Sequence, residues 1–244
     1  MAGVEPGGGG AARPGQSQDR AGVVAAGVRP AVAGGIRPLP AGTAGRPVRR
    51  TSGYNGRMHA PRFLADHFLI AVPAMDDPNF ARGLTLLCQH DEAGAMGLLV
   101  NRVSDYCLGD VLRQMKIETD DAALAAQPVL IGGPVQPERG FVLHDDGRDW
   151  VSTLRINDRL AVTTSRDILE AMARGEGPEH ALVALGYAGW TAGQLEAELA
   201  ENVWLTVPAD RDILFSLPLE RRWQAAAERL GVDLGRLADY SGRA

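Results

Sequence analysis

From Asp66 onward the chain carries a close succession of short apolar segments separated by glycine, proline and polar turns. The first, Phe68 to Val72, is a continuous apolar run closed by Pro73, which is typical of a strand buried on both faces. In the segment 84–90 apolar and other residues alternate, as in a strand with one core face. Further strand-length segments lie at 96–100, 128–131, 140–143, 160–163, 181–186 and 203–207.

Helical patterns lie between these strand segments. They cover Leu108 to Met115, the segment from the N-cap Ser165 to Gly175, a segment opened by the capping box Thr191 to Gln194, and a last helix from Pro218 to Gly231. Strands and helices neither alternate strictly nor separate into blocks. We therefore predict one mixed α+β domain with about four flanking helices.

Residues 1–57 differ in composition from the rest of the chain. They hold 14 glycines and 6 prolines, and Tyr54 is their one aromatic residue. Such a segment buries too little apolar surface to offset the entropy of ordering its backbone, so we predict a disordered tail before a domain at 64–240. Two interpretations of the tail remain: translated sequence upstream of a true start at Met58, or a native disordered arm.

Charge divides at the same place. Eight arginines stand against Glu5 and Asp19 in the tail, a formal charge of +6, which leaves −11 for residues 58–244 of a chain whose net charge is −5. An acidic domain has the wrong sign for neutralising phosphates, so we expect no direct DNA binding by the core. No apolar run approaches the roughly 18 to 20 residues of a membrane span, and two cysteines indicate a reducing compartment.

Cys88 and His90 are the first candidates for chemistry. They stand two apart in a predicted strand, so we expect both on one face. Two ligands do not complete a zinc site, no third group is visible that would orient a Cys–His nucleophile, and we predict neither a metal nor a cofactor. A buried small side chain at Cys88 is the simpler interpretation.

The Gly132-Gly133-Pro134 loop is the second candidate. Two glycines allow close backbone approach, and exposed amides there could hold an anion. The polar residues that could line a cleft with this loop are Asn101, Arg102, Arg139 and His144. The competing interpretations are a tight strand connection for the glycines and surface ion pairs for the two arginines.

Two helices have amphipathic patterns. The helix after Thr191 is expected to bury Leu195 and Leu199 and to turn Glu196, Glu198 and Glu201 outward. Trp190, Trp204 and Trp223 are large enough to dominate a core. The last helix is expected to carry Arg221, Arg222 and Arg229 towards one outer side.

Three blocks of residues resemble the YqgE/AlgH family of bacterial cytoplasmic proteins. The first comprises His67 to Pro73, Asp77 to Phe80, Cys88, His90, Gly94 to Leu98, Asn101 and Arg102. The second comprises Gly132 to Val135 and Arg139 to His144, and the third Tyr187 to Trp190, Gln194 to Glu196 and Asn202 to Leu205. The resemblance covers roughly residues 64 to 240.

The resemblance implies a compact fold with a curled, barrel-like mixed sheet. Its members are commonly labelled transcriptional regulators, and it supplies no catalytic set to transfer. We expect a cytoplasmic regulatory or interaction protein that acts through a protein partner or a small ligand. The alternatives are an enzyme whose anion-binding cleft uses His144 with Arg102 or Arg139, and a direct DNA-binding regulator.

Overall fold

The computed structural model describes residues 63–145 and 147–231, so the predicted tail at 1–57, Met58 and positions 232–240 of the predicted domain lie outside it. The strands are β1 His67–Ala71, β2 Leu84–Asp91, β3 Gly94–Leu99, β4 Val103–Cys107, β5 Pro128–Ile131, β6 Val135–His144, β7 Thr153–Arg155, β8 Ala161–Thr163, β9 Ala181–Thr191 and β10 Trp204–Pro208. The helices are α1 Leu108–Gln114, α2 Ala122–Ala125, α3 Arg166–Ala173, α4 Gln194–Ala200, α5 Arg211–Phe215 and α6 Leu219–Glu228.

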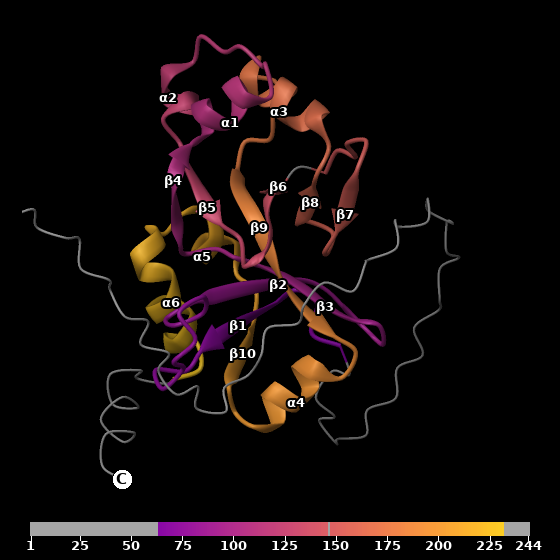
Figure 1. Ribbon diagram of the computed structural model, residues 1–244, viewed down its shortest axis with the longest axis vertical. Coiled ribbons are helices and arrows are strands. Elements are labelled where there is room, and N and C mark those ends of the chain that lie inside the picture. Colours follow the sequence, from indigo (N-terminus) through magenta and orange to yellow (C-terminus); the bar gives the residue numbers. More distant parts are fainter. Residues whose placement is uncertain (1–62, 146, 232–244) are drawn as a thin grey trace, which may run out of the picture.

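The ten described strands form one curled sheet with β9 at its centre. The strands follow the order β10-β1-β2-β3-β9-β6-β8-β7, and β5 pairs with β9 and carries β4. The first half of β9 pairs with β6 and, in parallel, with β5, whereas its second half pairs with β3. Gly186 divides the halves at a φ of 72°. Figure 1 shows β9 running from the upper half of the molecule to the lower half.

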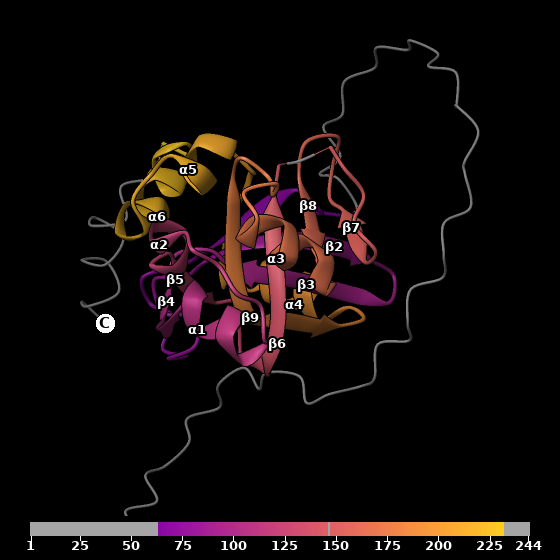
Figure 2. The same ribbon diagram turned by 90° about the horizontal axis from the view of Figure 1, so that it is seen from above.

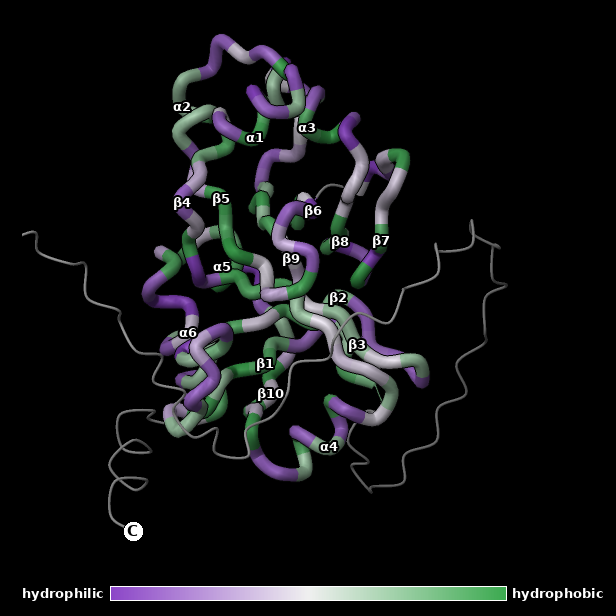
Figure 3. The backbone as a smooth tube through the Cα atoms, viewed as in Figure 1, coloured by the Kyte–Doolittle hydropathy of each residue, from purple (hydrophilic) through white to green (hydrophobic). Residues whose placement is uncertain are grey.

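Alternation along the strands sorts apolar side chains into three clusters. Phe68 and Ile70 of β1 point into the curl of the sheet, whereas Leu69 and Ala71 point to its outer face in the lower half. In the upper half, Val142 of β6 faces outward into the third cluster. Because both faces of these strands are buried, the segments read as continuous apolar runs, which Figure 3 shows as green stretches of β1 and β5.

Each cluster is closed by its own helices. Residues of α5 and α6 enter the cluster inside the curl, residues of α1 and α3 belong to the upper outer cluster, and Leu195 of α4 belongs to the lower outer cluster. Figure 1 shows α1 and α3 at one end of the molecule and α4 at the other, and in Figure 2, which looks down from the end of α1 and α3, α4 lies behind them. The predicted α+β fold with a curled, barrel-like mixed sheet is therefore confirmed.

Short elements account for most differences from the prediction. Strands β4 and β7 and helices α2 and α5 have three to five residues each and carry no clear period. The expected strand at 181–186 continues to Thr191, because the glycine at its centre bends β9 without ending it. Among the described residues, no helix combines the length and the apolar character that crossing a membrane requires.

Cys88 and His90 do not share a face, so that expectation was wrong. The register between β2 and β3 shifts between Leu87 and Gln89, which leaves Cys88 as an extra residue in a β-bulge. Cys88 lies inside the curl with Leu84 and Leu86, as simple alternation predicts, whereas His90 follows the bulge and bonds to Glu196 on α4, outside the curl. A single inserted residue reverses the face of every side chain that follows.

Arg222 is also placed differently from the prediction. Only 4% of its surface is exposed, and its guanidinium donates to the carbonyl oxygens of Leu217 and Val100 at 3.1 and 2.6 Å. Burial lowers the pKa of Arg222 to about 10. The residue links α6 to the end of β3 and does not contribute to an outer basic face.

The two thiols are expected to differ in reactivity. Burial raises the pKa of Cys88 to about 12, so its reactive thiolate is scarce, whereas Cys107 is half-buried at the start of α1. Labelling the native protein with a disulfide reagent should modify Cys107 quickly and Cys88 slowly, and labelling in denaturant should modify both thiols quickly. Peptide mapping that finds Cys88 modified first in the native protein would contradict the expectation.

Candidate functional site

Residues from all three sequence blocks meet at one cavity of about 720 Å³. A cavity of this size is ample for a small ligand. We call it the motif pocket. Its lining from the three blocks consists of Val72, Asp77, Pro78, Asn79 and Phe80, then Pro134 and Val135, then Gly189, Trp190, Gln194, Asn202, Val203 and Trp204. The remaining lining residues are Ala74, Met75, Asp76, Glu198 and Glu201.

A buried carboxylate lies in the wall of the motif pocket. Glu198 is 6% exposed, and its Oε2 accepts hydrogen bonds from the indole Nε1 atoms of Trp190 and Trp204 at 2.9 and 2.8 Å. Its Oε1 accepts from Gln194 Nε2 at 2.9 Å. Three donors therefore offset the desolvation of the carboxylate and fix its position.

The expected outward position of Glu198 was wrong. Leu195 and Glu198 are both buried, and their spacing of three residues places them on one side of α4. The sequence offers one local signal, since Glu198 follows the apolar Leu195 by three residues and lies between Trp190 at the end of β9 and Trp204 at the start of β10. Nothing in a single sequence indicated that two indole N–H groups would point at it.

Three aromatic rings form the apolar wall. The ring centroids of Phe80 and Trp204 are 5.5 Å apart, and those of Trp190 and Trp204 are 6.1 Å apart, both edge to face. The rings are 4 to 9% exposed and belong to the lower outer cluster with Leu195. The prediction that Trp190 and Trp204 contribute to a core is confirmed, and the same rings also line the cavity.

The first turn of α4 departs from the expected capping box. The helix begins at Gln194 after Gly193, whose φ is 76°. Gln194 Oε1 accepts from both the backbone N and the hydroxyl of Thr191 at 3.1 Å, so the hydroxyl is a donor here and does not cap the helix. Gln194 thereby links the end of β9 to Glu198.

His90 attaches α4 to β2 on another side of the helix. Leu64 N donates to His90 Nδ1 at 2.9 Å, so the proton of the neutral ring lies on Nε2, which is 3.1 Å from Glu196 Oε1. Glu196 is 47% exposed and His90 is buried. Both residues belong to the blocks of the resemblance, and together they hold the helix that carries Glu198.

Arg102 and Asn101 hold the loop between β1 and β2. Arg102 donates to the carbonyl oxygens of Pro78, Asn79 and Ala81 at 2.7 to 2.9 Å. Asn101 accepts from Leu84 N and donates to the carbonyl of Arg82, both at 2.9 Å. Since Pro78 and Asn79 line the motif pocket, these side chains shape its wall from behind.

Replacing Arg102 with alanine should lower the free energy of unfolding by about 1 to 3 kcal/mol, because three carbonyl groups lose a charged donor. Thermal or urea unfolding measures this loss, and Arg139→Ala is the control, since Arg139 bonds only weakly to Gln136 at 3.4 Å. Equal stabilities of the two variants would contradict the role given to Arg102.

The glycines of the predicted anion loop pack against β9. A Cβ on Gly132 would lie 2.2 Å from the carbonyl oxygen of Gly186, and a Cβ on Gly133 would lie 2.1 Å from the carbonyl carbon of Tyr187. Gly132 N already donates to Leu185 O at 2.7 Å. These contacts fit the strand-connection interpretation, and they position Pro134 at the motif pocket.

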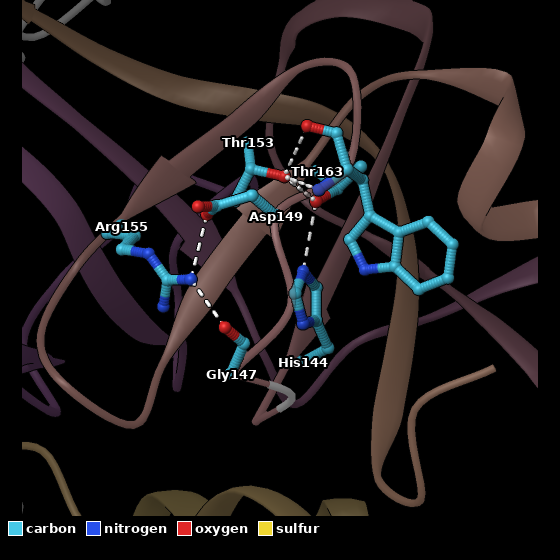
Figure 4. A network of polar contacts seen from close by, with 7 residues as sticks. His144, Gly147, Asp149, Thr153, Arg155 and Thr163 are labelled. Atoms are coloured by element: carbon cyan, nitrogen blue, oxygen red, sulfur yellow. Dashed lines mark hydrogen bonds and ion pairs between the residues drawn. The ribbon is translucent and has the colours of Figure 1, made fainter. Parts of the chain in front are cut away.

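Arg139 and His144 lie elsewhere on β6. Arg139 lines a second cavity of about 1120 Å³ beside α1 and α3, and its guanidinium lies 5.3 Å from the ring centroid of Phe141. His144 is fully buried, and its Nε2 is 2.9 Å from Thr163 Oγ1, which is 2.8 Å from Thr153 Oγ1. Figure 4 shows this chain of contacts beside the ion pair of Arg155 and Asp149.

The six candidate residues therefore do not meet in one cleft. Asn101, Arg102, Gly132 and Gly133 lie behind the motif pocket, whereas Arg139 lies in the middle of β6 at the second cavity and His144 at the end of that strand. Their role in ligand binding stays a prediction. The arrangement of Phe80, Trp190 and Trp204 around the Glu198 carboxylate was not predicted from the sequence.

Several known proteins are similar to this chain in sequence or in structure. The sequence profile described as AlgH-like matches residues 68–235. A UPF0301 protein of Stenotrophomonas maltophilia (strain K279a) is 65% identical over 182 residues, which are 75% of this chain and 97% of that protein. A UPF0301 protein of Xanthomonas campestris pv. campestris (strain B100) is 64% identical over 184 residues, 75% of this chain and 98% of the relative.

Two solved structures share the fold. The solution structure of the AlgH protein from Pseudomonas aeruginosa has a TM-score of 0.64 and 53% identity, and the match covers 75% of this chain and 96% of that one. The crystal structure of protein DIP2367 from Corynebacterium diphtheriae has a TM-score of 0.58 at 21% identity, over 72% and 91% of the two chains, and supports the fold alone. The profile match and these identities show that the chain belongs to the AlgH-like family.

Proposed function

We propose that this protein is a cytoplasmic regulatory or interaction protein that binds a small ligand in the motif pocket. The observation that carries the proposal is the convergence of all three sequence blocks on one cavity with a fixed carboxylate and an aromatic wall. Concave, largely apolar cavities with a few precisely held polar groups are typical ligand sites. Two cysteines that lie free in the described chain fit a reducing compartment.

We favour ligand binding over catalysis because the side chains proposed for an enzyme, Arg102 and His144, are not available to a substrate in the motif pocket. Arg102 is engaged by three backbone carbonyls, and His144 is fully buried among strands of the upper half. Neither side chain lines the motif pocket. Regulation would follow if ligand in this pocket changed the loop before β2 or the position of α4, since both contribute to its wall.

Native mass spectrometry of the full chain, purified gently from cells, tests the proposal. We expect additional mass of a small molecule that is lost on denaturation. Ala74→Tyr should reduce this mass, because Ala74 is exposed and lines the pocket, whereas Ala123→Tyr on α2 should retain it. A protein without bound mass, or bound mass unaffected by Ala74→Tyr, would contradict a ligand at this site.

A further inference from the structure

The motif pocket also indicates the chemistry of its ligand. We propose that it binds an organic cation, an alkylammonium or guanidinium group carried on a short apolar stem. The proposal rests on the proposed function, because it identifies the class of ligand for the same cavity. Three features of the pocket support it: the charge of its lining, its aromatic wall, and the way in which its buried carboxylate is held.

Charge is the first feature. Four carboxylate side chains line the cavity, those of Asp76, Asp77, Glu198 and Glu201, and its described lining includes no lysine, arginine or histidine. An anionic ligand would meet like charge on several sides, whereas a cation would be attracted over the whole mouth. Low-dielectric walls strengthen this field, because a cleft with charges of one sign focuses the potential.

The aromatic wall is the second feature. Phe80, Trp190 and Trp204 supply three π systems to one cavity. An ammonium or guanidinium group near the face of such a ring gains roughly 0.5 to 2 kcal/mol, and its alkyl stem is compatible with the same apolar surface. Carboxylates beside aromatic rings select a cation over an uncharged molecule of equal shape.

Glu198 is the third feature. Its two tryptophan donors and Gln194 keep the carboxylate in a fixed position, 6% exposed, at the wall of the cavity. A carboxylate has about four lone-pair sites on its two oxygens, and these donors use two on Oε2 and one on Oε1, so Oε1 retains capacity for a donor from a ligand. Preorganisation of this kind reduces the ordering cost of binding.

The larger cavity beside α1 provides a contrast within the same molecule. Its lining combines Arg139 with Asp105, Asp110 and Glu138, and the hydroxyl groups of Thr163, Thr164 and Ser165, which precede α3, add further polar atoms. Because this lining carries both positive and negative side chains, the larger cavity has no clear preference for a cationic or an anionic ligand. The cation preference is therefore a property of the motif pocket in particular.

Tryptophan indole signals in a two-dimensional ¹⁵N–¹H NMR spectrum of the full chain test the proposal. Four tryptophans give four signals, of which only those of Trp190 and Trp204 report on the pocket. The matched probes are n-butylammonium, n-butanol and n-butyrate at constant ionic strength. We expect butylammonium to shift the Trp190 and Trp204 signals in a saturable titration, with Trp150 and Trp223 unchanged.

A charge variant adds a quantitative test. The double variant Asp76→Asn, Glu201→Gln keeps shape and removes two exposed charges of the lining, so we expect its affinity for butylammonium to fall about three- to tenfold. The matched control, Glu138→Gln with Glu179→Gln, alters carboxylates outside the motif pocket and should bind as the parent does. Equal affinity in the two double variants would overturn the proposal.

The same titrations separate failure of the cation class from failure of the site. Butanol or butyrate shifting the two signals as strongly as butylammonium would overturn the cation class and leave a ligand site. Absence of shifts with every probe, in a protein that also carries no bound mass, would overturn both proposals. A capped Gly-Arg-Gly peptide distinguishes the two sources of the cationic group. Tighter binding of the peptide than of butylammonium indicates the side chain of a protein partner, and weaker binding indicates a small molecule. Either result supports a cationic ligand.

Discussion

Glu198→Ala is expected to lower the free energy of unfolding by about 3 to 5 kcal/mol. Alanine removes the acceptor of two buried indole N–H groups and of Gln194, and each buried donor left without a partner costs about 1 to 3 kcal/mol. Glu198→Gln keeps one acceptor oxygen for the two indoles and should lose only about 1 to 2 kcal/mol. Urea unfolding followed by circular dichroism measures these differences.

Glu201→Ala is the control for this series. Glu201 lies next to α4 and lines the same pocket, but it is exposed, so its removal should change stability by no more than about 0.5 kcal/mol. If Glu198→Ala unfolds at the urea concentration of Glu201→Ala, the indole bonds contribute little, and the account of a fixed carboxylate is wrong.

Gly133→Ala should destabilise the protein by a similar amount, about 3 to 5 kcal/mol, through the backbone alone. Gly133 has a φ of 154°, which side-chain-bearing residues rarely adopt, and the new Cβ would lie 2.1 to 2.4 Å from backbone atoms of Tyr187 and Ala188. Strain of this kind costs about 1 to 3 kcal/mol, and overpacking adds about 1 to 3 kcal/mol.

Gly140→Ala is the matched substitution on the neighbouring strand. A Cβ at Gly140 meets nothing within 4 Å, and its φ is not positive, so alanine there should be neutral or stabilising by up to about 1 kcal/mol. Both variants can be compared by thermal unfolding in one buffer. Equal melting temperatures would contradict the close packing of the Gly132–Gly133 loop on β9.

The long apolar segments of the fold were predictable because burial on both faces leaves a strong pattern. Phe68 to Val72 is the clearest case, since its alternate side chains enter two different clusters and nearly every position is apolar. The four long helices follow for a similar reason, because caps and apolar stripes are local. Elements such as β4 and α2 consist mostly of exposed or half-buried residues, so they carry no such local signal.

Register and polar partners were not predictable from one sequence. The bulge at Cys88 depends on how β2 meets β3, and it alone decides that His90 faces α4. In the sequence Glu198 has the pattern of a surface residue, and only the fold shows that the indoles of Trp190 on β9 and Trp204 on β10 bond to it. The sequence therefore identified the motifs that form the candidate site, but it did not predict that they line one pocket.

The central position of β9 has a consequence for synthesis of the protein. Strands β3, β5 and β6 all pair with β9, and they end 82, 50 and 37 residues before β9 begins at Ala181. Until positions 181–191 leave the ribosome, these strands expose unpaired backbone edges, which are templates for intermolecular association. We therefore expect this chain to be most exposed to aggregation during synthesis just before β9 emerges.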